Sequence, residues 1–139
     1  QVTGRVGRGH IKSEFFIQTR QPNHPIIESA LERNWQSFYD YESSKRKQFH
    51  YPPYTNLAIL KITKSKLKTV ESSAEKLANK LAKIKGITVL GPSPSFYEYN
   101  NGKYTWQIVL KSKSRAAILN AALQAPSEWT IDIDPLNLL

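Results

Sequence analysis

The chain has 139 residues, no cysteine and a net charge of +9. Without cysteine it holds no disulfide and no thiolate zinc site, and no apolar run approaches the roughly 18 residues needed to span a bilayer. The excess of Lys and Arg favours a polyanionic partner such as nucleic acid, because neutralised phosphates release counterions. A basic surface that only keeps the protein in solution is the alternative.

The first half of the chain predicts one strand and one long helix. The apolar run at residues 15–17 is typical of a buried strand. A helix over residues 25–49 begins at Pro25, with Asn23 or His24 as its cap. The Tyr-Pro-Pro-Tyr sequence at residues 51–54 ends it. An apolar stripe is expected along the helix at Ile27, Leu31, Trp35 and Phe38.

The second half predicts alternating strands and helices. Asn100-Asn101-Gly102 is typical of a tight hairpin turn, and Ser114 of a helix cap. The resulting β-α-β-β-α-β order is that of an α+β, ferredoxin-like domain, whose sheet carries two helices on one face and leaves the other open. The expected elements are strand 57–62, helix 67–84, strand 87–99 interrupted at 91–94, strand 103–111, helix 115–125 and strand 129–133.

Residues 1–8 carry the pattern with the clearest chemistry, Gln-Val-Thr-Gly-Arg-Val-Gly-Arg. Glycines let the backbone turn closely, and Arg5 and Arg8, three residues apart, share one helix face. Paired guanidinium groups suit a phosphate whose charge develops during hydrolysis; a simple basic loop is the alternative. Every fixed position matches motif VI of superfamily 2 helicases, which the segment resembles. The resemblance implies that Gln1, Arg5 and Arg8 contact ATP phosphates, with Arg8 as the arginine finger.

Further along, the chain resembles the C-terminal part of the primosomal protein N-prime (PriA) family. The resemblance rests on residues 15–18 and 23–25, and on short motifs spread over the rest of the chain: Tyr51-Pro52-Pro53-Tyr54, Val89-Leu90-Gly91-Pro92, Tyr104-x-Trp106-Gln107 and Asp132-Ile133-Asp134-Pro135. It implies a fragment that starts at motif VI of an ATP-dependent 3′ to 5′ DNA helicase. Such a helicase recognises stalled or abandoned replication forks and initiates primosome assembly. The absence of methionine, with Gln1 opening a motif, agrees with a fragment.

The resemblance also implies a division of the chain and a set of partners. Residues 1–24 would end the second helicase lobe, residues 25–50 would form a connecting helix, and residues 51–139 would form a domain that binds DNA or a partner. The implied partners are branched and single-stranded DNA, single-stranded DNA-binding protein, and primosome and helicase-loader proteins. We expect a cytoplasmic monomer without membrane contact.

The parent's cofactors are expected to lie outside this chain. The sequence has no Gly-x-x-x-x-Gly-Lys-Ser/Thr loop, no Asp-Glu-x-His element and no cysteine. ATP with magnesium and structural zinc would therefore belong to the parent protein, and the fragment alone should not hydrolyse ATP. No metal site is predicted, since the three histidines are scattered. Asp132 and Asp134 alternate on the last strand, which favours a solvated strand face with Lys or Arg as partners over a cation site.

Aromatic and basic residues of the second half are the candidates for contact with DNA or a partner. Aromatic rings stack on bases while cations hold phosphates; core packing and an ordinary solvated surface are the alternatives. Trp106 and Trp129 fit the core better. The resemblance places Arg115 in a pocket for the acidic tail of single-stranded DNA-binding protein. A protein-interaction module without DNA binding and an RNA-binding module are the competing functions. The candidate residues are Lys103, Tyr104, Lys111, Lys113 and Arg115.

Overall fold

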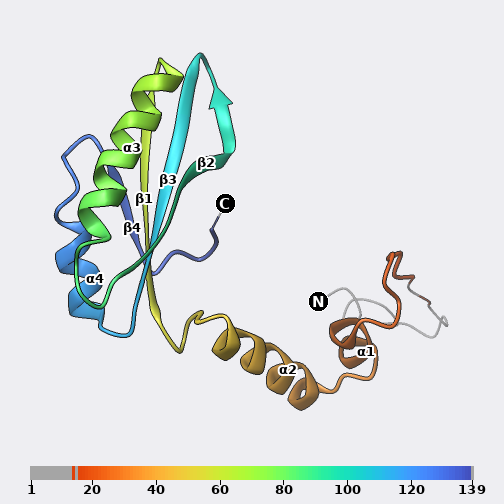
Figure 1. The fold of residues 1–139 in the computed structure, drawn as a ribbon. Helices are drawn as coiled ribbons and strands as arrows, with labels where there is room; N and C mark the ends of the chain where they lie inside the picture. The colour runs from red at the N-terminus through yellow and green to blue at the C-terminus, as the bar shows by residue number, and fades with distance from the viewer. Residues whose placement is uncertain (1–13, 15, 139) are drawn as a thin grey trace. The chain divides into compact units, whose positions relative to one another are not determined.

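The computed structural model describes residues 14 and 16–138, and the chain divides into two units, residues 1–42 and 43–139. Figure 1 traces the elements of each. None of the described helices has the length and apolarity to cross a bilayer. The three-part division expected from the sequence, with borders after residues 24 and 50, stays a prediction.

The helix expected over residues 25–49 is two helices, α1 (Pro25–Leu31) and α2 (Trp35–Gln48). His24 caps α1, and its Nδ1 accepts a hydrogen bond from the Ile26 N–H at 3.3 Å. Arg33 takes a positive φ of 54°, which ends the first helix. Asn34 Oδ1 then accepts from the Ser37 N–H at 3.0 Å and starts the second. The prediction of one helix was wrong because this cap lies inside the apolar periodicity.

The buried strand expected at residues 15–17 is also wrong for the residues described. Phe16 is 89% exposed and Ile17 is 47% exposed. The described part of this segment has no strand conformation. A strand needs a neighbouring strand for its backbone hydrogen bonds. No described residue forms such a pairing with Phe16 or Ile17.

The C-terminal unit contains a four-stranded sheet in the order β2-β3-β1-β4, with every neighbouring pair antiparallel. Two helices join these strands in the order β1-α3-β2-β3-α4-β4. This is the split β-α-β arrangement, so the α+β, ferredoxin-like prediction is confirmed. The bounds are β1 (Asn56–Lys64), α3 (Leu67–Leu81), β2 (Thr88–Asn100), β3 (Lys103–Ser112), α4 (Arg115–Ala122) and β4 (Thr130–Ile133).

One face of the sheet packs against α3 and α4 and forms the main core (Figure 1). Leu60 and Ile62 of β1 and Ile108 and Leu110 of β3 are at most 1% exposed on this face. Their period of two places them together. Trp129 is 6% exposed, and Trp106 packs against the same cluster. Both tryptophans thus belong to the core, as predicted.

Strand β2 is continuous rather than interrupted, but its pairing with β3 shifts twice. The shifts lie between Leu90 and Ser93 and between Pro94 and Tyr99. Extra residues are accommodated as bulges, which bend the strand without ending it. The hairpin after β2 turns through Asn101 and Gly102 at φ values of 49° and 74°, which confirms the predicted turn.

Gly91 is required at the first of these bulges. Its φ is +95°, and a Cβ there would lie 3.1 Å from the Gln107 carbonyl oxygen and 3.1 Å from the Ser93 nitrogen. We expect Gly91→Ala to lower the free energy of unfolding by about 2–4 kcal/mol, measured by urea denaturation. Gly86→Ala is the matched control, because Gly86 has φ +83° with nothing within 4 Å. Equal losses in the two variants would contradict the role given to close packing at Gly91.

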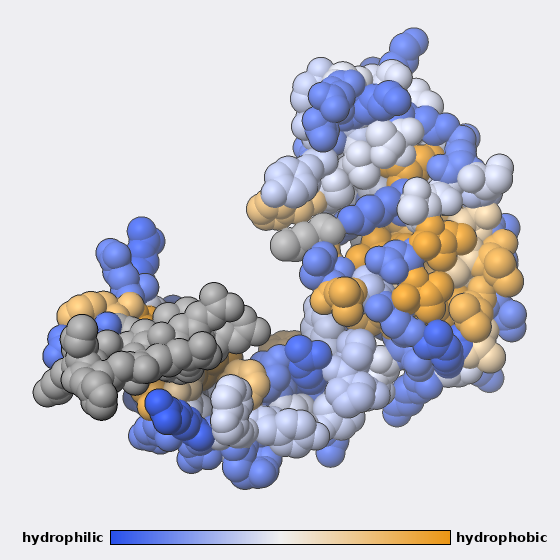
Figure 2. All heavy atoms as spheres, turned by 180° about the vertical axis from the view of Figure 1, so that it is seen from behind, coloured by the Kyte–Doolittle hydropathy of each residue, from blue (hydrophilic) through white to orange (hydrophobic). Residues whose placement is uncertain are grey.

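Within the C-terminal unit, no described helix packs on the other sheet face. Leu57, Ile59 and Val109 are buried there against Tyr51 and Leu138. Gln107 Nε2 donates to the Leu138 carbonyl at 3.4 Å, so the last described residues lie over this face. Seen from behind, the C-terminal unit shows a patch of apolar side chains framed by hydrophilic ones (Figure 2).

Candidate functional site

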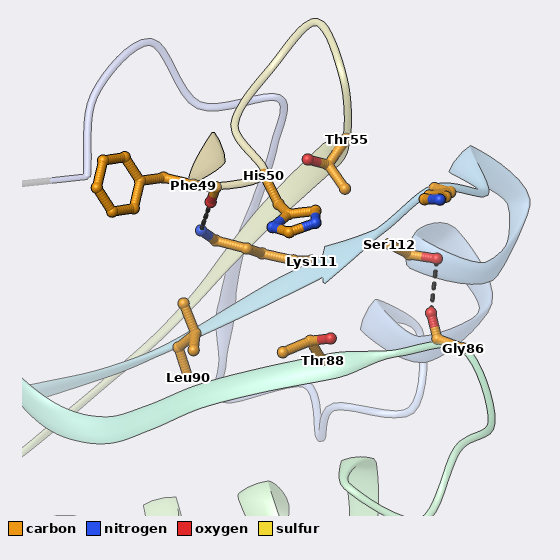
Figure 3. Close-up of a pocket in the computed structure, with 9 residues that line it drawn as sticks. Phe49, His50, Thr55, Gly86, Thr88, Leu90, Lys111 and Ser112 are labelled. Atoms are coloured by element: carbon orange, nitrogen blue, oxygen red, sulfur yellow. Dashed lines mark hydrogen bonds between the residues drawn. The ribbon is translucent and has the colours of Figure 1, made fainter. Parts of the chain in front are cut away.

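A cleft of about 390 Å³ lies where the residues after α2 meet strands β2 and β3 (Figure 3). It is open to solvent on one side, and its floor is the end of β3. The cleft therefore brings together residues 49–55, the start of β2 and the end of β3, which are far apart in the sequence. The lining residues are Phe49, His50, Thr55, Gly86, Thr88, Leu90, Lys111, Ser112 and Lys113.

Lys111 ties the chain after α2 to strand β3. Its Nζ donates to the Phe49 carbonyl at 3.2 Å and lies 3.8 Å from the centroid of the Tyr51 ring. Figure 3 shows this side chain running along the floor toward Phe49. A carbonyl and an aromatic face both stabilise the ammonium group. Burial nonetheless lowers the pKa of Lys111 from its ordinary value.

The wall beside Lys111 is lined by hydroxyl groups. Ser112 Oγ donates to the Gly86 carbonyl at 2.8 Å and accepts from the Ser114 N–H at 3.2 Å. Thr55 Oγ1 is buried and has no hydrogen-bond partner among the described residues. Buried polar atoms nearly always have a partner, so the Thr55 hydroxyl is an exception in this wall.

The charged side chains that line the cleft indicate which class of ligand it can bind. Lys111 and Lys113 supply cations and His50 an imidazole ring, and the described residues that line the cleft include no carboxylate. Ammonium and hydroxyl groups together bind oxyanions such as phosphate or carboxylate through charge-assisted hydrogen bonds. The cleft is thus suited to an anionic group. Within the described residues, no group of three His, Cys, Asp or Glu side chains is placed to hold a metal ion.

The unpaired hydroxyl gives a test of the local packing. Thr55→Val replaces the hydroxyl by a methyl group of similar volume. We expect it to raise the free energy of unfolding by about 1 kcal/mol, because the unpaired oxygen no longer needs to be desolvated. Ser112→Ala, the control, should lower it by about 1–3 kcal/mol, since two hydrogen bonds are lost. Urea denaturation measures both; a loss at Thr55 equal to that at Ser112 would contradict an unpaired hydroxyl.

The structure divides the five predicted binding residues between two ends of β3. Lys111 and Lys113 line the cleft. Arg115 begins α4 and forms an ion pair with Asp134, the kind of partner expected for that aspartate. Lys103 and Tyr104 lie at the opposite end of β3, about 26 Å away at about 3.3 Å per residue. The five therefore do not form one site.

Several residues that line the cleft were not predicted from the sequence, and some predicted site residues lie outside the described part of the chain. His50, Thr55 and Thr88 come from two further segments, and no periodicity signals that these segments meet Lys111. The one sequence signal near these residues is the Tyr-Pro-Pro-Tyr motif at residues 51–54. Gln1, Arg5 and Arg8 lie outside the described residues, so their contact with ATP phosphates stays a prediction.

Comparison with known proteins identifies the family. Residues 47–136 match the family model described as "Primosomal protein N C-terminal domain". The chain is similar to "Replication restart protein PriA" of Synechocystis, with 30% identity over 99% of this chain and 18% of that protein. The Haemophilus influenzae protein of the same name is 30% identical over 99% of this chain and 20% of its own length. The Treponema pallidum protein is 31% identical over 100% of this chain and 23% of its own length.

The chain spans about a fifth of the length of these relatives. The family match covers most of the C-terminal unit, including β1 to β4 and both helices between them. These matches agree with the short motifs found in the sequence. They show that the chain belongs to the family of the primosomal protein N C-terminal domain.

Proposed function

We propose that this chain is the C-terminal part of an ATP-dependent 3′ to 5′ DNA helicase that acts in replication restart. The observation that carries the proposal is similarity along the whole chain to proteins named for replication restart. The helicase recognises stalled or abandoned forks in the cytoplasm and initiates primosome assembly there. The match of residues 1–8 to a helicase motif supports the motor function.

In this proposal the motor's cofactors are ATP with magnesium, and a structural zinc lies elsewhere in the parent protein. Gln1, Arg5 and Arg8 contact the ATP phosphates. Arginine placed at a transferring phosphoryl group stabilises charge that develops in the transition state. This chain alone lacks a phosphate-binding loop and is not expected to hydrolyse ATP.

The C-terminal unit itself binds DNA and single-stranded DNA-binding protein. The net charge of +9 favours a polyanion, and the cleft at Lys111 and Lys113 suits an oxyanion. A DNA phosphate and a carboxylate of an acidic tail share this chemistry. Helicase-loader and other primosome proteins are further partners of the parent.

The second candidate function is a protein-interaction module without direct DNA binding. It is favoured by the small size of the cleft, about 390 Å³, which accommodates a chain end more readily than a duplex. This candidate predicts binding of an acidic peptide and no affinity for DNA at moderate salt.

Fluorescence anisotropy of the 139-residue chain separates the two candidates. Labelled fork DNA, duplex DNA and an acidic peptide are titrated at several salt concentrations. Fork binding that is tighter than duplex binding and weakens with salt supports a DNA-binding helicase tail. Binding of the peptide alone supports the interaction module and contradicts DNA binding by this chain.

Two variants test whether the anionic ligand binds in the cleft. Lys113→Ala removes a cation that lines it, whereas Lys76→Ala removes an exposed lysine from α3. We expect the first to weaken binding of the anionic ligand, because Lys113 lines the cleft. The second should leave binding within about twofold, because an exposed charge outside the cleft contributes little. Equal effects would indicate that only net charge matters, and would contradict a defined site.

A further inference from the structure

The second half of β2 and the start of β3 expose a group of aromatic rings. Phe96 is 67% exposed, Tyr97 74% and Tyr99 62%. Such large rings usually contribute to cores or interfaces, and clustered exposure of this kind marks interaction surfaces. We name residues 95–104 the tyrosine hairpin.

The rings of the tyrosine hairpin are held in defined positions. Phe96 and Tyr97 meet edge to face with centroids 5.0 Å apart, and Tyr99 and Tyr104 are 4.8 Å apart at 48°. The second bulge of β2 supplies the extra residues that project here. Ser95 Oγ donates to the Tyr97 carbonyl at 3.0 Å and fixes the bulge. The rings are thus largely ordered before any partner arrives, which lowers the entropy cost of binding.

Cations gather at the same end of the sheet. Tyr104 lies opposite Lys64 in the β1–β3 pairing, and Lys66 is the cap residue of α3. Lys68 lies in the first turn of α3, which carries no acidic residue. Lys103 follows the hairpin turn. Figure 1 shows the end of β1, the start of α3 and the start of β3 side by side at this end.

The local balance of charge is positive. Glu128 forms an ion pair with Lys64, and Glu98 is the one carboxylate within the tyrosine hairpin. Lys66, Lys68 and Lys103 are exposed at this end of the sheet. Aromatic faces for bases and cations for phosphates are the two elements of surfaces that bind single-stranded nucleic acid.

We propose that the tyrosine hairpin is a stacking surface for single-stranded DNA. Bases stack on Tyr97 and Tyr99, and Lys66, Lys68 and Lys103 contact the backbone. Duplex DNA does not fit this chemistry, because its base faces are already stacked inside the helix. The proposal rests on the DNA-binding function proposed above, and adds a second contact that lies about 26 Å along β3 from the cleft.

Anisotropy with a labelled oligothymidine and a labelled duplex tests the stacking surface on the 139-residue chain. We expect Tyr97→Ala and Tyr99→Ala each to weaken binding of the single strand by about 5- to 150-fold. Tyr97→Phe and Tyr99→Phe keep the rings and should stay within about twofold. Duplex binding should change little in all four variants. Both tyrosines are mostly exposed, and thermal melting checks that each variant remains folded.

The lysines give a readout that is independent of stacking. Lys103→Ala should reduce the slope of log affinity against log salt by about 0.7, the value for one phosphate contact with a single strand. Alanine variants that bind the single strand as the parent chain does would overturn the stacking surface while leaving DNA binding intact. A parent chain that binds neither single strand, duplex nor fork would overturn the proposed DNA binding itself, and with it this inference.

Discussion

Replacing Arg8 by Lys is expected to reduce DNA-stimulated ATP hydrolysis by about a thousandfold or more in the longer protein of which we propose this chain is a part. An arginine finger contributes about 10³–10⁵ to the rate of phosphoryl transfer. Its planar guanidinium donates two hydrogen bonds to one phosphate, which a lysine ammonium does not reproduce. The expectation rests on the helicase motif at residues 1–8, which lies outside the residues that the structure describes.

Steady-state hydrolysis with fork DNA measures the effect. Since the finger acts mainly in the transition state, kcat should fall far more than the affinity for ATP. Fork binding without nucleotide should be unchanged. Arg20→Lys, at an exposed position of the same region, is the matched control and should retain the rate. Full activity of the Arg8 variant would remove the basis for assigning the finger to this residue.

The order of elements in the C-terminal unit could be predicted because each signal is local. The apolar run over residues 57–62 identifies β1, and alternating apolar residues identify β3 and β4. The three-to-four spacing from Leu67 to Leu81 identifies α3. Ser114 Oγ accepts from the Ala117 N–H at 3.2 Å, as its place before the helix indicates. Helix α4 ends at Ala122 rather than at 125. Helix ends are less well fixed by periodicity than helix centres.

The errors in the first unit have physical reasons of the same kind. Apolar residues on both sides of Arg33 continue one periodicity, but the backbone turns there and Asn34 caps a new helix. Trp35, the first residue of α2, is 76% exposed. A short apolar run such as residues 15–17 shows only that burial would be favourable. Whether another part of the protein covers this run depends on long-range contacts, and a local sequence pattern does not reveal those.

The candidate site was only partly predictable. Lys111 lies near the end of β3 and Lys113 just beyond it, and both line the cleft. Lys111, predicted as a contact for DNA or a partner, is engaged within the protein by the Phe49 carbonyl and the Tyr51 ring. That engagement joins residues about sixty positions apart. Long-range contacts of this sort leave no trace in spacing or composition.

The core prediction can be tested at Leu60, at the centre of the sheet. Leu60 is fully buried, with Ile108 of β3 and Ile131 of β4 as its strand neighbours. Leu60→Ala should lower the free energy of unfolding by about 2–5 kcal/mol, because apolar contacts are lost and a cavity remains. For a domain whose total stability is about 5–15 kcal/mol, this is a large fraction. Urea denaturation followed by tryptophan fluorescence is a suitable measurement, since Trp129 lies in the same core.

Leu90→Ala provides the comparison, because Leu90 is 42% exposed on edge strand β2. It removes the same atoms from a site that solvent already reaches, so the loss should stay below about 1 kcal/mol. Comparable losses at the two positions would mean that the sheet face under α3 and α4 is not the principal core. A large difference would establish that this face holds the unit together. Variants in the cleft and in the tyrosine hairpin lie outside this core, so we expect the unit to stay folded when they are tested.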